Sequence, residues 1–164
     1  MARPKSSPNS HPATRNKPGP IKFFDDGKVK RPGDLVMLRW TALNVLKHEG
    51  KLGEVHLVFC SDETVRALNN EFRHLDKTTD VLSFPWNSDE NDLVEGPFLG
   101  EIYVSMPQVE RQAPEYGATK RQELERVIVH GLLHLCGHDH ATPTQRRKMR
   151  ELEEHYLGRQ LYAR

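Results

Sequence analysis

The chain has 164 residues, 36% of them hydrophobic, which is enough for one domain with its own core. It carries 24 lysine and arginine residues against 23 aspartate and glutamate residues, so global charge gives no evidence for a nucleic-acid partner. Two cysteines, Cys60 and Cys136, are too few for a disulfide framework. No apolar run approaches the roughly 20 residues that span a bilayer, and no secretory signal pattern is present. We therefore expect a soluble cytoplasmic protein without membrane contacts.

Residues 1–20 are predicted to form a disordered tail. Five of the 11 prolines lie there among Ser, Asn and Gly, and almost nothing apolar is available for burial. The charged side chains of this segment are all basic: Arg3, Lys5, Arg15 and Lys17. They fit either a solvated extension or an arm that contacts a polyanion. The folded domain is expected to occupy residues 21–164.

Apolar periodicity, capping residues and turn residues predict the elements of this domain. Strands are expected at 21–24, 54–60, 80–84 and 98–105, with a polar, acidic loop or hairpin end at 87–96 between the last two. Helices are expected at 34–48, from Ser61 to about Phe72, in a short stretch after Ser105 that Pro114 disturbs, at 119–136, and from Thr142 to about Leu157.

The helix at 119–136 has the strongest pattern. Thr119 is a plausible N-cap, and Leu124, Val127, Ile128 and Leu135 form the expected buried stripe. Because strands and helices are mixed without a regular βαβ alternation, we predict the α+β class. The expected architecture is a single domain with a small mixed sheet, helices packed against it, and a metal site at the end of this central helix.

The metal site is predicted from histidine spacing. Four of the nine histidines lie within residues 130–140, and His130 and His134 are one helical turn apart on the same face. Gly137 can end the helix in a left-handed conformation, and the reversed chain then brings a third imidazole, His140, to the same point. Three neutral imidazoles leave one tetrahedral position of a zinc ion open for water, which the ion acidifies. Such an open site is typical of a hydrolytic enzyme.

Three neighbouring positions qualify this interpretation. His138 could compete with His140 as a ligand, although His140 gives the chain two more residues in which to reverse. Asp139 could be a partner of a ligand, a general base, or simply a solvated turn residue. Gly131 stands where a zincin protease has the glutamate that acts as general base, so peptide hydrolysis is disfavoured.

These residues resemble a known family. The segment HGLLHLCGHDH, which begins at His130, is similar to the HGxLHLxGYDH signature of the YbeY family of bacterial endoribonucleases. The stretch 68–85 resembles the family pattern LNxxYRxxDxPTDVLSFP, and 99–105 resembles LGDIxIS. The sequence departs from these patterns by replacing a tyrosine with His138, a tyrosine with Phe72, a proline with Thr78 and an aspartate with Glu101.

The resemblance implies a metal-dependent endoribonuclease that prefers single strands and acts in 16S rRNA 3′-end maturation and ribosome quality control. Its implied partners are single-stranded RNA, the 16S rRNA precursor and the ribosome or its small subunit, with no DNA. It implies one zinc ion held by His130, His134 and His140, and it places Arg73 opposite the metal across a cleft. Arginine offers a planar, permanently charged fork for a phosphodiester. The alternative for Arg73 is a surface ion pair with Asp76 or Glu71.

One basic cluster remains, formed by Arg146, Arg147, Lys148 and Arg150. It either lies along the path of an RNA strand or is a solvated helix face balanced by nearby glutamates. Two other functions stay open. One is a non-catalytic ribosome-assembly factor whose zinc holds the C-terminal helices together, and the other is a metallohydrolase with another substrate, such as a peptide.

Overall fold

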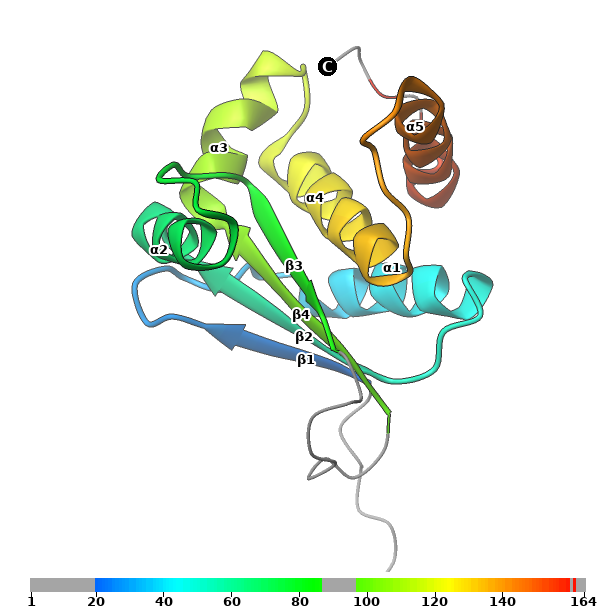
Figure 1. Cartoon of the computed structure of the whole chain (residues 1–164), viewed down its shortest axis with the longest axis horizontal. Coiled ribbons are helices and arrows are strands. Elements are labelled where there is room, and N and C mark those ends of the chain that lie inside the picture. Colours follow the sequence, from blue (N-terminus) through cyan, green and yellow to red (C-terminus); the bar gives the residue numbers. More distant parts are fainter. Residues whose placement is uncertain (1–19, 87–96, 160, 162–164) are drawn as a thin grey trace, which may run out of the picture.

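A mixed sheet forms the centre of the molecule. The computed structural model describes residues 20–86, 97–159 and 161. Within these residues, four strands form one sheet in the order β1-β2-β4-β3. The strands are β1 (Ile21–Asp25), β2 (Glu54–Cys60), β3 (Val81–Pro85) and β4 (Phe98–Ser105). β1, β2 and β4 are parallel and β3 runs antiparallel to β4, which confirms the expected α+β class with a mixed sheet (Figure 1).

The helices of the described residues begin at the side chains that the sequence offers as caps. They are α1 (Leu35–His48), α2 (Asp62–Arg73), α3 (Met106–Glu115), α4 (Lys120–Leu135) and α5 (Pro143–Leu157). The residue before each helix accepts a hydrogen bond from a first-turn N–H, and these residues are Asp34, Ser61, Ser105, Thr119 and Thr142.

The predicted boundaries hold to within one or two residues. α3 includes Pro114 and ends one residue later. A proline so near the helix end is tolerated, because it deprives only the carbonyl of the exposed Glu110 of its helical partner. The expected loop at 87–96 and the predicted tail, apart from Pro20, lie outside the described residues.

The two faces of the sheet differ in what covers them. Val55, Leu57 and Phe59 of β2 are fully buried in the main core, together with apolar residues of α1, α3 and α4. A smaller cluster on the opposite face contains Val65 of α2 and Leu82 of β3. Figure 1 shows α4 lying over the sheet, with α1 and α5 beside it. No helix within the described ranges is long and apolar enough to cross a bilayer.

α4 is the central helix and approaches the sheet closely. Leu124, Val127 and Ile128 are buried as predicted, whereas Leu135 near the helix end is only half-buried. At Gly131, an added Cβ would lie 2.8 Å from Cγ2 of Ile102 in β4 and 3.2 Å from the Ser83 hydroxyl oxygen in β3. That hydroxyl donates a 3.0 Å hydrogen bond to the Gly131 carbonyl. A side chain here would therefore push α4 off the sheet, and the histidines on either side of Gly131 with it.

We predict that Gly131→Ala destabilises the protein. Overpacking of a filled core costs about 1–3 kcal/mol, and alanine returns at most about 1 kcal/mol through its helix propensity. Urea denaturation should therefore show a lower free energy of unfolding. Gly33→Ala is the matched control, because nothing lies within 4 Å of the Cβ it would add. A Gly131→Ala protein as stable as the wild type would contradict the packing argument.

Candidate metal centre

Three imidazoles meet where α4 ends. His130 and His134 lie one turn apart on α4, and His140 lies in the loop that leads to α5. The Nε2 atoms of His130 and His134 are 3.0 Å apart, and one ring nitrogen of each of the three histidines lies within 4.8 Å of the other two. Among the described residues, this is the group of histidine, cysteine and carboxylate side chains that could hold a metal ion.

The chain reversal that brings His140 back has a specific hydrogen-bond pattern. Gly137 has a φ of 96°, in the left-handed region that favours glycine. Its N–H donates to the carbonyl of His134, and the N–H of His138 donates to the carbonyl of Leu133. These two bonds make a Schellman motif, which ends α4 and turns the chain sharply. The glycine turn predicted from the sequence is thus confirmed.

The charge state of the imidazoles suits a cation. His134 is half-buried, and burial together with the neighbouring His130 and His140 lowers its pKa to about 4. This imidazole is therefore neutral at physiological pH, and neutral imidazole is the form that binds a metal ion. The neutral ring of His134 presents a lone pair to an ion shared with the two neighbouring imidazoles.

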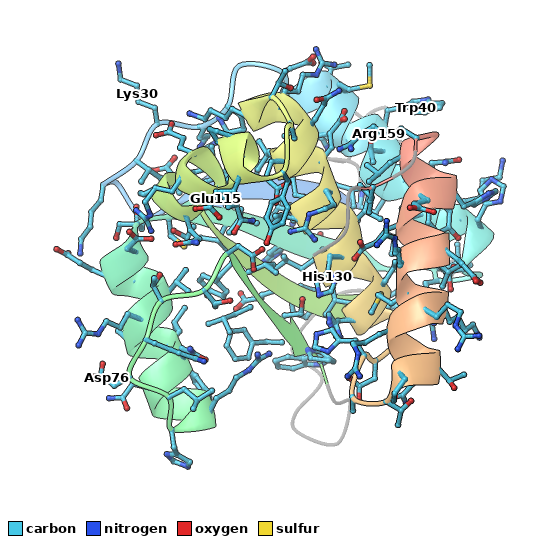
Figure 2. The ribbon with its side chains drawn as sticks, turned by 90° about the horizontal axis from the view of Figure 1, so that it is seen from above. Lys30, Trp40, Asp76, Glu115, His130 and Arg159 are labelled. Atoms are coloured by element: carbon cyan, nitrogen blue, oxygen red, sulfur yellow. The ribbon has the colours of Figure 1, made fainter. Side chains whose placement is uncertain are left out.

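Glu153 of α5 orients the first of the three rings. Its carboxylate contacts Nδ1 of His130, and Nε2 of the same ring faces His134. A carboxylate that accepts the Nδ1–H bond fixes the tautomer whose Nε2 lone pair is free for a metal ion. Figure 2 shows His130 beside α5. The donor set and its outer partner therefore fit a bound metal ion.

His138 points elsewhere. Its Nε2 lies 2.7 Å from a carboxylate oxygen of Glu49, the residue that caps α1. The hydroxyl of Tyr156 in α5 donates to the other oxygen of the same carboxylate. His138 thus ties the loop between α4 and α5 (residues 136–142), which we call the metal loop, to α1, while His140 joins the other two histidines. This contact explains how a histidine can occupy the position that holds tyrosine in the family pattern.

A cavity of about 510 Å³ opens beside the histidines, and we call it the Arg73 cavity. It is bordered by α2 and the segment that follows it, by β3, and by the metal loop. Its lining residues are Asn69, Arg73, Leu75, Lys77, Thr79, Asp80, Val81, Ser83, His130, His134, Asp139 and His140. The structure therefore brings Arg73 to the same cavity as the three histidines, although they lie far apart in the sequence.

The alternative for Arg73, a surface ion pair, is not observed. Both oxygens of Asp76 are taken by Arg66, at 2.7 and 2.9 Å. Within the described residues, neither Asp76 nor Glu71 pairs with Arg73. Asp139 also lines the cavity, and one of its oxygens accepts the backbone N–H of His140 at 2.7 Å, as in a turn.

A buried charge network, which was not predicted from the sequence, lies behind the histidines. The Arg126 side chain is 6% exposed and bonds Glu123 at 2.9 Å and Asp80 at 3.0 Å. It also lies 4.0 Å from Glu153, the partner of His130. Asp80, the residue before β3, is thereby linked to the metal centre. The available signal was Glu123 and Arg126 on the apolar side of a helix, where charges persist only when paired.

Comparison with known proteins is consistent with this site. Residues 34–160 match the family model described as endoribonuclease YbeY. An endoribonuclease YbeY from Shouchella clausii is 39% identical over 148 residues, which cover 84% of this chain and 92% of the relative. One from Heliobacterium modesticaldum is 44% identical over 115 residues, 65% of this chain and 69% of that protein.

A solved structure agrees as well. The solution structure of a Thermotoga maritima protein is similar to this fold with a TM-score of 0.55 and 31% identity, covering 84% of this chain and 89% of that one. The resemblance found in the histidine motif thus extends to most of the sequence and to the fold. The chain belongs to the YbeY family of endoribonucleases.

Proposed function

We propose that this protein is a zinc-dependent endoribonuclease that cuts single-stranded RNA in 16S rRNA 3′-end maturation and ribosome quality control. Its substrate is the 16S rRNA precursor, free or within the small subunit, and it acts in the cytoplasm. The observation that carries the proposal is the Arg73 cavity, which combines three clustered imidazoles with an unpaired arginine. Cleavage of a 16S rRNA 3′ fragment by metal-loaded but not metal-free protein is the direct test.

Zinc suits the donor set best. Imidazole nitrogens are preferred zinc ligands, and three of them leave a position for substrate or water. When bound, zinc supplies Lewis-acid chemistry: it polarises phosphoryl oxygens and acidifies water. Glu153 keeps His130 in the tautomer that this binding requires, and the Schellman turn holds His140 in reach.

Arg73 and Lys77 provide the positive charge that a phosphodiester needs on the other side of the cavity. Both line it, and the Arg73 guanidinium has no ion-pair partner among the described residues. An unpaired arginine fork can donate hydrogen bonds to two phosphate oxygens and neutralise the charge that builds up on the phosphate during attack. We assign this role to Arg73.

The two other functions fit the structure less well. A structural zinc site is normally closed by four protein ligands, whereas the described residues bring three together beside an open cavity. A zincin protease needs a glutamate at the position of Gly131, which packs against β3 and β4 with no room for a side chain. The first observation favours a catalytic over a structural metal ion, and the second disfavours peptide hydrolysis.

We predict one zinc ion per chain, and that His130→Ala, His134→Ala and His140→Ala each remove it. Loss of one of three ligands leaves too few donors to retain the ion. His138→Ala is the matched control, because its ring binds Glu49 and should leave zinc content unchanged. Elemental analysis of the purified proteins measures the zinc content of each variant. Full occupancy in any of the three ligand variants, or loss in His138→Ala, would refute the assignment.

Replacing Arg73 with alanine should lower cleavage about 100-fold, the usual effect of removing one donor that stabilises transition-state charge. Folding and zinc content should stay intact, because a partnerless surface arginine contributes less than about 1 kcal/mol to stability. Arg66→Ala, on the same helix but paired with Asp76, is the control and should cleave normally. Normal cleavage by a zinc-loaded Arg73→Ala protein would remove Arg73 from the mechanism.

We predict that water, not the RNA 2′-hydroxyl, attacks the phosphorus. Attack by the 2′-hydroxyl needs a base near the sugar, usually a histidine. His138 is bonded to Glu49, His74 is not among the residues that line the cavity, and Asp139, which does line it, accepts the backbone N–H of His140. A 2′-deoxy substitution at the cleaved nucleotide should therefore still be cut, without a 2′,3′-cyclic phosphate among the products. Mass spectrometry of the fragment ends decides it: a cyclic end, or full protection by the deoxy sugar, would reverse the assignment.

A further inference from the structure

A second cavity lies on the other side of the histidines, between α4 and α5. Its volume is about 390 Å³, and we call it the α5 cavity. Its lining residues are Arg126, His130, His140, Arg146, Arg147, Met149, Arg150, Glu153 and Leu161. His130 and His140 line both cavities, so the metal centre forms the boundary between them. A strand that crosses the metal from the Arg73 cavity would continue into the α5 cavity.

The charge along α5 is unusual for a helix. Its first turn has no acidic residue, and Arg146, Arg147, Lys148 and Arg150 all precede Glu151. Backbone N–H groups give a helix N-terminus a partial positive charge, so cations there reduce helix stability while a nearby anion increases it. The N-terminal part of α5 is thus positive, with no acidic side chain in its first turn, which favours an anion there over a cation.

The arginines of the cavity differ in what they already bind. Arg146 donates to the carbonyls of His140 and Ala141, and so holds the metal loop. Arg150 pairs with Glu154 and donates to the carbonyl of Leu161. Arg147, in contrast, has no hydrogen bond, ion pair or ring contact with any part of the chain that the structure describes.

Arg147 shares this property with Arg73. Of the arginines at 20–86 and 97–159, these two alone lack a partner, whereas Arg31, Arg66 and Arg121, for example, each pair with an aspartate. Each unpaired arginine lines one of the two cavities that flank the histidines. The single carboxylate in the α5 cavity, Glu153, is engaged by His130 and lies near Arg126. An entering phosphate therefore meets little uncompensated negative charge.

We propose that the α5 cavity binds a phosphodiester of the same RNA strand that is cut at the metal, and that Arg147 is the residue that receives it. This inference rests on the proposed function, because it takes the strand to be the substrate. The reacting phosphate lies at the histidines and Arg73, and a neighbouring phosphate on the strand lies against Arg147. The second contact aligns the strand across the His130–His140 boundary and adds affinity without touching the reacting atoms.

The test compares Arg147→Ala with Lys148→Ala in the full-length, zinc-loaded protein. Lys148 carries the same charge on the next residue, but it does not line the cavity and its charge acts on Glu49. Binding of a short single-stranded oligouridylate is measured by fluorescence anisotropy over a range of salt concentrations, and gel analysis confirms that the RNA is intact. Loss of one phosphate contact should lower the slope of log affinity against log salt by about 0.7 and weaken binding about threefold at moderate salt.

We expect this change in Arg147→Ala and no change in Lys148→Ala, with equal zinc content in both. An unchanged slope in Arg147→Ala, or equal losses in the two variants, would overturn the proposal. The readout is binding, so it is separate from the proposed function. If the protein binds RNA through Arg147 but cuts none, the phosphate site stands and the proposed nuclease activity is refuted. If Arg147→Ala cleaves normally and its salt slope is unchanged, the nuclease activity stands and the phosphate site is refuted.

Discussion

The contact between Nδ1 of His130 and the Glu153 carboxylate joins the helix that carries two of the histidines to the helix that carries the basic cluster. It orients the ring toward His134 and joins α4 and α5 beside their apolar packing. The α5 cavity and the metal centre share His130 as a wall, so this hydrogen bond bears on both. A carboxylate–histidine pair of this kind usually supports a metal ligand.

Such a pair is costly to bury unless its charge is balanced. Glu153 is 5% exposed, and Arg126 supplies the nearest positive charge behind it. Arg126 in turn bonds Glu123 and Asp80, and Gln112 donates to both of these carboxylates. Removing one member of a buried charge network leaves another charge without a partner, which lowers the free energy of unfolding by about 3–5 kcal/mol. The histidine geometry is therefore held by the core as well as by any bound ion.

Members of the network also line both cavities. Asp80 lines the Arg73 cavity, while Arg126 and Glu153 line the α5 cavity. The network thus reaches both cavities from behind the histidines. Because all of its members are paired inside the protein, the free positive charge on the two cavity walls comes from other residues. Positioning and substrate contact are in this way assigned to different side chains.

What the sequence could predict was local. The i,i+4 histidines, the glycine turn and the capping residues depend on a few neighbouring positions, and they follow from helix geometry alone. The Arg126–Asp80 bond joins residues that are 46 apart in sequence, and the Glu49–His138 bond joins residues 89 apart. Neither leaves a periodic pattern. The strand order β1-β2-β4-β3, which brings β3 under α4, is likewise set by long-range packing rather than by any local signal.

The balance of charge shows why composition could not reveal an RNA-binding surface. The net charge is only +1, because acidic residues are almost as numerous as basic ones. Ion pairs compensate many of the arginines within a few ångströms, which weakens the field that an approaching polyanion meets there. Among the described arginines, the two without a partner, Arg73 and Arg147, stand on either side of the three histidines. A nearly neutral protein can thus present a localised site for a phosphate backbone, because unpaired arginines in the two cavities give a local positive charge that the net charge does not reveal.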